Sequence, residues 1–286
     1  MGSIRDKENY ISNIILEKST VYTKRKIYKN KTLKYIFRQG RQGITLQIYG
    51  FLYIFANKIA NKNKMRYSDY ETALSPARLS RYSNACGGDK NKALTLYRHN
   101  VKLCQKFYGV LSLFEVVLRN AINEHYKQYF VDCDWIKTQM QPGGMLENCP
   151  QAAEVGNHIT RLINAGKYTH DRLVSSVSFG FWTYLFNKQP FRKGGQTLLA
   201  IFPKRSRGLG RKAIYNELMA IKAFRNRIAH HEPICFDQYG NKDVIFAQNN
   251  YDQILKYIDF LKYNKNELFF GLDILPDKTI AKINSL

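Results

Sequence analysis

No proline occurs between Pro76 and Pro142, and a helical pattern runs through most of this stretch. Apolar side chains recur there at three- and four-residue steps: Ala93, Leu96, Tyr97, Leu103, Phe107, Leu111, Phe114, Leu118, Ile122 and Tyr129. This spacing places them on one face of an α-helix, and no proline interrupts its hydrogen bonds. The pattern predicts one long helix through Phe130, or two in series with a break near Asn100 or Gly109.

Shorter helices are predicted on both sides of this stretch. Ser75 and Pro76 form an N-cap and a first helical residue, which opens a helix over 76–84, and Asp89 caps the long helix. After a polar stretch at 132–150, further helices are expected over 151–165, 176–187, from Pro190, over 210–231 and, as the last one, over 249–263. Only Val244–Ala247 looks extended. The predicted fold class is all-α.

Charge divides the chain into two parts. Residues 1–64 hold 14 Lys and Arg against three Asp and Glu, so they are far more basic per residue than the rest. We predict a basic N-terminal extension over 1–64, loosely ordered or partly helical, and the main helical domain over 65–286. The extension either helps to hold RNA or contributes little. Its apolar run Ile44–Ala56 is either a marginal membrane anchor or, as we prefer, a short amphipathic or buried helix, because a spanning helix needs ~20 residues.

The overall charge indicates the kind of partner. With 45 Lys and Arg against 22 Asp and Glu, the formal net charge is +23, which attracts polyanions: nucleic acid first, an anionic membrane face second. A content of 44% apolar residues excludes disorder of the whole chain. The five cysteines are odd in number and never form a C-x-x-C pair, which argues against a disulfide framework and a thiolate zinc site. We therefore expect a protein of the reducing cytoplasm.

Chemistry-bearing residues gather at the end of the predicted helix 210–231. Its apolar stripe, Ile214, Leu218, Ile221 and Ile228, skips one position, and the residue four after Ile221 is Arg225. A guanidinium on an inward stripe must be paired, hydrated by a cleft or awaiting an anion. It is either a structural ion pair or part of a site with its neighbours Asn226, His230, His231 and Glu232.

Arginine and histidine together suit RNA cleavage without a metal. Histidine can take the proton of a ribose 2′-OH, which then attacks the neighbouring phosphate, and arginine can neutralise the charge that grows on the phosphoryl oxygens. A cyclic 2′,3′-phosphate results. The leaving 5′-oxygen also needs a proton, and a two-fold homodimer would supply a second histidine for it.

The sequence Arg225–His230 resembles the R-N-x-x-x-H signature of HEPN-domain ribonucleases, and its continuation through Ile234 resembles Abi-like abortive infection proteins of the AbiD/AbiF type. Four other segments resemble that family in the same order along the chain: 74–82, 93–97, 114–120 and 178–182. The likeness covers residues 68–263. It implies a HEPN-type helical bundle with additional helices, a dimer with a composite site, RNA cleavage without a metal and bacterial defence against phage.

Other candidate site residues have two readings each. Glu115 and Arg119 either form a helix pair, or Glu115 is a carboxylate that orients Arg225 or Arg119 near the site. Phe179, Phe181 and Trp182 either stack on RNA bases or belong to the core. A basic stretch without acidic residues is either an RNA-binding ramp or a solvated loop; it contains Arg192, Lys193, Lys204, Arg205, Arg207, Arg211 and Lys212.

These observations lead to one functional hypothesis with alternatives. We expect a metal-independent endoribonuclease toxin of an abortive infection system, with Arg225, Asn226 and His230 as catalytic residues. His231, Glu232, Glu115 and Arg119 would support them. The main alternative is a non-catalytic HEPN protein that sequesters a regulatory RNA, and a membrane-associated effector is a third. The sequence predicts no metal site and no cofactor, because it lacks H-E-x-x-H and a P-loop. The expected partners are RNA, a second copy of the chain and a small RNA or protein antidote, rather than a membrane.

Overall fold

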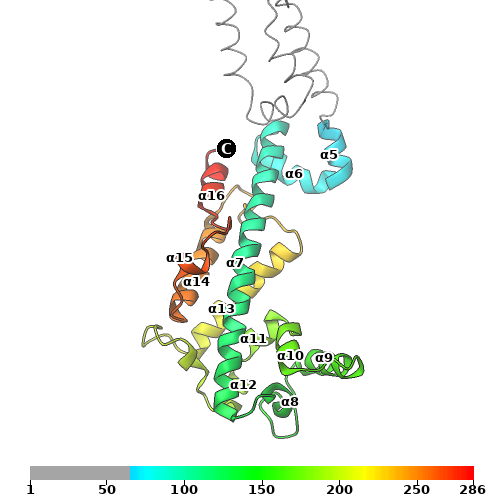
Figure 1. The fold of residues 1–286 in the computed structure, drawn as a ribbon. Coiled ribbons are helices and arrows are strands. Elements are labelled where there is room, and N and C mark those ends of the chain that lie inside the picture. The colour runs from blue at the N-terminus through cyan, green and yellow to red at the C-terminus, as the bar shows by residue number, and fades with distance from the viewer. Residues whose placement is uncertain (1–64) are drawn as a thin grey trace, which may run out of the picture. The chain divides into compact units, whose positions relative to one another are not determined.

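A single helix of 41 residues, α7 (Lys90–Phe130), runs the length of the part that the structure describes (Figure 1). The structure is a computed structural model that describes residues 65–286, and Tyr67–Leu286 form one compact unit. The predicted extension 1–64 and its run Ile44–Ala56 lie outside the described residues. Within 65–286 no strand forms, and the one isolated bridge joins Phe236 to Lys242. The all-α prediction is confirmed.

The predicted break in α7 is absent at both places. Asn100 is buried, and its side chain reaches across to a distant segment instead of interrupting the helix. Gly109 lies where Ile274 packs against α7, so closely that a Cβ atom would collide with the Ile274 side chain. Glycine is therefore kept here for close approach, although it costs about 1 kcal/mol of helix propensity.

Two short helices precede α7: α5 (Tyr67–Leu74) and α6 (Pro76–Ala85). The predicted caps are confirmed, because the Ser75 side chain accepts a hydrogen bond from the Arg78 N–H and Asp89 accepts from the first turn of α7. Helix α6 packs against α7 and brings Arg78 near the C-terminal end of α13.

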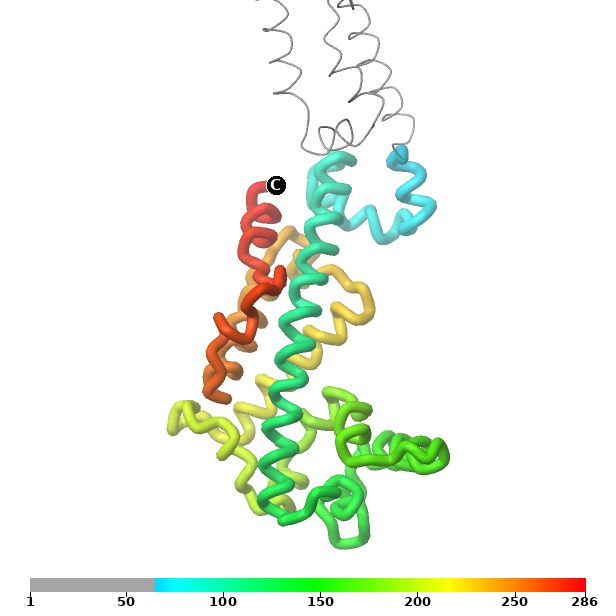
Figure 2. Tube along the Cα trace, viewed as in Figure 1, coloured from blue at the N-terminus to red at the C-terminus, as the bar shows by residue number. Residues whose placement is uncertain are grey.

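Beyond α7 the chain forms small helices at its lower end in Figure 1 and then returns along it. These are α8 (Trp135–Gln139), α9 (Ala152–Asn164), α10 (His170–Ser176), α11 (Phe179–Tyr184), α12 (Lys188–Lys193) and the 3₁₀ turn η1 (Leu198–Ile201). The return path consists of α13 (Arg211–Ala229), α14 (Ile245–Phe260), α15 (Lys265–Leu268) and α16 (Asp277–Asn284). Figure 2 shows the C-terminal helices beside α7.

Two predictions about the C-terminal part are wrong. Val244–Ala247 is not extended, because α14 starts at Ile245 with Val244 as its N-cap residue. The predicted helix over 249–263 is also not the last one, since α15 and α16 follow it. The core explains α16: Thr279, Ile280 and Ile283 are buried there, although the helix is only eight residues long.

The core lies where α7 meets α13 and α14. Phe107 of α7 packs edge-on against Phe224 of α13 at a ring distance of 4.8 Å. Two turns before Phe224, Glu217 accepts hydrogen bonds from Lys256 and Tyr257 of α14, at 2.8 and 2.7 Å. Apolar packing and a shared carboxylate thus hold α13 against α7 and α14, which sets the position of its C-terminal end.

Candidate functional site

The site residues predicted from the R-N-x-x-x-H pattern lie in the last turns of α13. The helix ends with two closing hydrogen bonds, from the His231 N–H to Ile228 and from the Glu232 N–H to Arg227. His231 has a φ of +58°, which this helix ending requires and which glycine more often adopts. His230 is the C-cap residue, and its side chain is exposed.

The apolar stripe of α13 is complete, which corrects the reading of Arg225. Phe224 is fully buried and fills the place three residues after Ile221 and four before Ile228. The spacing Ile221–Phe224–Ile228, three residues and then four, fits the helical period as well as the predicted spacing Ile221–Arg225–Ile228, four residues and then three. Arg225 lies beside Phe224 with 42% of its side chain exposed, so it is not sealed in the core.

Arg225 forms an ion pair with Glu115 of α7. Its Nε–H donates to Glu115 Oε1 at 3.0 Å. Arg119 instead donates to the neighbouring Asn120 at 3.5 Å, and within 65–286 it forms no ion pair with Glu115. The structure therefore pairs Glu115 with Arg225 rather than with Arg119. The contact uses Nε, and the Nη groups of Arg225 form no hydrogen bond with the residues of 65–286.

Three side chains hold the segment after α13. Arg78 donates to the His231 carbonyl at 2.8 Å, and Arg227 donates to the Pro233 carbonyl at 2.7 Å. The buried Asn100 accepts from the Ile234 N–H at 2.9 Å. Glu232 belongs to the same support, since its carboxylate lies 3.5 Å from Arg227 Nε. The backbone that follows His230 is thus fixed by α6, α7 and α13.

A cavity of about 250 Å³ opens beside Arg225 and Asn226; we call it the Arg225 cavity. Its other lining residues come from α9, α11, the residues that cap them, and α13: Gln151, Glu154, Ser178, Phe179, Gly180 and Lys222. His230 does not line it. The structure therefore places Arg225 and Asn226 together in a cavity, with His230 one turn beyond Asn226 at the helix end.

The thiols near the site are not nucleophiles. Burial raises the pKa of Cys104 to about 11 and that of Cys235 to about 12. Both are therefore protonated at neutral pH, and the thiolate is the reactive form. All five cysteines lie in the described part of the chain and are free thiols there.

The predicted basic stretch lies at the other end of α13. Lys193 pairs with Glu147, Lys204 pairs with Asp259, and Arg211 donates to the Phe186 carbonyl. Arg205 has a buried Nε, whereas three members are exposed without an ion pair in the described structure: Arg192, Arg207 and Lys212. Arg211 starts α13, so 14 residues separate it from Arg225, about 21 Å along the axis. The basic stretch and Arg225 do not form one site.

The aromatic cluster of α11 belongs to the core. Phe179, Phe181 and Trp182 are each at most 5% exposed, and Phe179 packs near Phe114 of α7. All three are core residues, as one of the two alternatives predicts, and Phe179 also lines the Arg225 cavity.

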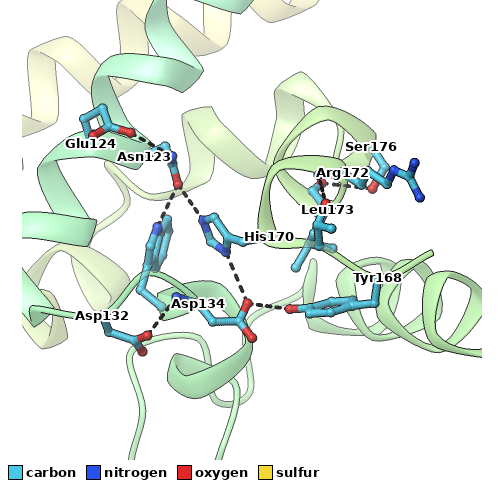
Figure 3. A network of polar contacts seen from close by, with 11 residues as sticks. Asn123, Glu124, Asp132, Asp134, Tyr168, His170, Arg172, Leu173 and Ser176 are labelled. Atoms are coloured by element: carbon cyan, nitrogen blue, oxygen red, sulfur yellow. Dashed lines mark hydrogen bonds and ion pairs between the residues drawn. The ribbon is translucent and has the colours of Figure 1, made fainter. Parts of the chain in front are cut away.

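A second polar cluster lies at the C-terminal end of α7 (Figure 3). Asn123 Oδ1 accepts from Trp135 Nε1 at 3.0 Å and lies 2.8 Å from His170 Nε2, while Asp134 contacts both His170 and Tyr168. Burial and the Asp134 hydrogen bond raise the pKa of Tyr168. Because these groups satisfy one another, the cluster joins α7, α8 and α10 rather than offering a free catalytic group.

Two further features concern metals and membranes. Within residues 65–286, no three His, Cys, Asp or Glu side chains are grouped so that they could hold a metal ion. No helix of that same part has the length and apolar character needed to cross a membrane.

Comparison with known proteins identifies no relative: no protein-family model, no curated protein and no solved structure matches the chain significantly.

The site also contains residues that the sequence did not indicate. Asn100, Arg78 and Lys222 are the clearest of these. Lys222 has a local signal, because it precedes Asn226 by four residues and so shares its helix face. Asn100 and Arg78 have no such local signal, since each contacts a residue more than 130 positions away in the sequence.

Proposed function

We propose that this chain is a metal-independent endoribonuclease of the HEPN type that acts as the toxin of a bacterial abortive infection system. The observation that carries the proposal is the state of Arg225: it is half-exposed at a cavity, paired with Glu115 through Nε, and its Nη groups form no hydrogen bond with any residue in 65–286. Such a guanidinium suits a phosphate, which accepts two parallel hydrogen bonds from it.

The chemistry assigns one role to each catalytic residue. His230 removes the proton from a ribose 2′-OH, and the resulting 2′-oxygen attacks the adjacent phosphorus. The P–O5′ bond breaks, the 5′-oxygen takes up a proton, and a 2′,3′-cyclic phosphate remains. Arg225 stabilises the charge on the phosphoryl oxygens, and Asn226 orients the reacting groups.

The segments that resemble the family support the proposal by where they lie. Segment 74–82 supplies Arg78, segment 114–120 supplies Glu115, and segment 178–182 lines the Arg225 cavity. Three of the four segments, which are far apart in the sequence, thus contribute residues near the C-terminal end of α13.

The proposed assembly is a two-fold homodimer in which the α13 helices of two chains meet. The outer face of α13 carries small exposed side chains at steps of three and four, and His230 lies on the same face. These side chains are Ala213, Asn216, Ala220 and Ala223. Small residues allow two helices to approach closely, and one His230 could then act as base while its symmetry mate acts as acid.

The decisive test is cleavage of total RNA by purified protein in EDTA. We expect the wild type to give fragments with 2′,3′-cyclic phosphate ends, and Arg225→Ala or His230→Ala to lower the rate at least ~10²-fold without loss of the folded state. The matched control is Arg172→Ala, an exposed arginine on α10. Fragments that persist in His230→Ala would refute the catalytic assignment. RNA binding without cleavage by the wild type would favour sequestration.

The dimer has its own test. The mass is measured by light scattering after nuclease treatment in ~0.5 M salt, where the Debye length falls to roughly 4 Å and RNA bridging is screened. We expect twice the chain mass. A monomer under these conditions, fully active at nanomolar concentration, would refute the composite site.

A further inference from the structure

Lys222 is a cation in the Arg225 cavity that the proposed mechanism does not use. It belongs to one row of α13 with Asn226 and His230, because the three are spaced by four residues. Its ammonium group forms no ion pair and no hydrogen bond within residues 65–286. It thus faces the cavity with three donors available.

The walls of the cavity leave room for this ammonium group. A Cβ atom at Gly180 of α11 would lie 3.3 Å from both Cε and Nζ of Lys222, so the lysine lies across the bare backbone of that glycine. Any larger residue at position 180 would press on the end of the lysine. The side chain therefore lies along a wall of the cavity rather than extending freely into solvent.

The one carboxylate among the lining residues is occupied by another group. Glu154 accepts hydrogen bonds from the Ser178 N–H and the Ser178 hydroxyl, at 3.1 and 3.2 Å. It lies more than 4.0 Å from Lys222, since no ion pair joins them. Glu154 thus holds α9 to the start of α11 and leaves the lysine charge unpaired.

The spacing of the two cations fits a single RNA strand. Lys222 and Arg225 are three residues apart on one helix, so their Cβ atoms are about 5–6 Å apart. Two long side chains at this separation can each hold one of two phosphates joined by a single nucleotide. The cavity between them, at about 250 Å³, lies where that nucleotide would be.

We propose that Lys222 binds the phosphate adjacent to the scissile phosphate, so that the Arg225 cavity is a subsite for the nucleotide between the two. This inference rests on the proposed function, because it takes Arg225 as the residue that holds the scissile phosphate. Lys222 is a substrate-positioning residue in this scheme and takes no part in proton transfer.

The first experiment measures binding and does not depend on cleavage. The probe is a 2′-O-methyl dodecanucleotide, which cannot be cut, and its Kd is measured by fluorescence anisotropy between 50 and about 300 mM salt. Loss of one phosphate contact lowers the slope of log Kd against log salt by ~0.7 for a single strand. We expect this change in Lys222→Ala but not in Lys222→Arg. The control Lys278→Ala removes the same charge from α16 and should keep the wild-type slope.

The second experiment assigns the phosphate. The substrate is a short 2′-O-methyl oligonucleotide with one ribose 2′-OH at a mapped cut site, and each flanking phosphate in turn is made a neutral methylphosphonate. In the wild type, neutralising one adjacent phosphate should lower kcat/KM about tenfold, the low end for a hydrogen bond to a charged group. In Lys222→Ala the same neutralisation should have no further effect.

The outcomes separate the two proposals. An unchanged salt slope in Lys222→Ala overturns the subsite, whatever the cleavage result. The subsite is also overturned if neutralising each of the two adjacent phosphates lowers kcat/KM by the same factor in Lys222→Ala as in the wild type. If the wild type does not cleave RNA at all, the proposed function fails, and the salt slope alone still decides whether Lys222 contacts a phosphate.

Discussion

Replacing Asn100 by alanine should destabilise the protein more than its single long-range hydrogen bond suggests. Asn100 is 4% exposed, and its Oδ1 accepts from the N–H of Ile234, a residue that is fully buried. Alanine would leave that N–H without an acceptor and without access to water, which costs about 1–3 kcal/mol. The lost volume adds a smaller term. We expect Asn100→Ala to lower the free energy of unfolding by about 2–3 kcal/mol.

The matched control is Asn120→Ala on the same helix. Asn120 is exposed and receives only a long contact of 3.5 Å from Arg119. Both substitutions gain the same helix propensity, so their difference isolates the buried contact. Arg78→Ala removes an exposed bond to the same segment and should cost under about 0.5 kcal/mol.

The assay is equilibrium unfolding in urea followed by far-ultraviolet circular dichroism. With an m value near 2–3 kcal/mol/M, a loss of about 2–3 kcal/mol moves the midpoint by roughly 1 M. If Asn100→Ala and Asn120→Ala unfold within 0.2 M urea of each other, the buried amide does not hold the segment after α13 and the reasoning is wrong. Because that segment follows His230 directly, we also expect Asn100→Ala to reduce RNA cleavage.

Three further predictions concern other parts of the structure. Gly109→Ala should destabilise by about 1–2 kcal/mol, since overpacking against Ile274 exceeds the gain in helix propensity. Acid should weaken the fold as the pH falls below 6.5, because burial lowers the pKa of His125 from that value and the unfolded chain binds the proton more readily. Glu115→Ala should lower RNA cleavage at least tenfold while costing under about 1 kcal/mol, because the pair with Arg225 is half-exposed.

Each of these has a measurement that could contradict it. In an Ile274→Ala background, Gly109→Ala should become stabilising in the same urea assay; a loss that persists would exclude the collision as its cause. The loss of stability between pH 7 and pH 5 should be smaller in His125→Gln, and an unchanged profile would be inconsistent with the assignment. Full RNA cleavage by Glu115→Ala would show that Arg225 needs no orienting partner.

The helices were predictable where periodicity and caps agree. α6, α7, α9 and α13 follow from apolar spacing together with Ser75, Asp89 and the proline-free stretch. The predicted break in α7 is wrong because Asn100 and Gly109 serve contacts with distant residues: Asn100 accepts a hydrogen bond from Ile234, and Gly109 lets Ile274 pack closely. α10, α15 and α16 have four to eight residues, too few turns for a period to be read.

The candidate site was predictable only along one helix. The pattern of α13 predicts Arg225, Asn226 and His230, but its apolar stripe does not lack a residue, because Phe224 fills the place assigned to Arg225. Glu115 could be named as one of two alternatives, and its choice of partner required the packing of α13 against α7. Such contacts depend on how helices cross, which a single sequence does not encode locally.

The way Glu115 contacts Arg225 bears on how the pair would act. A carboxylate that bound both Nη groups would have to be displaced before a phosphate could enter, at the cost of breaking two charge-assisted hydrogen bonds. The contact through Nε at 3.0 Å avoids that step. In the proposed mechanism it would hold the plane of the guanidinium while the Nη edge stays available, so the donors would already be oriented when substrate arrives. Preorganised donors of this kind need little rearrangement during the reaction, and this is the property that lowers a barrier.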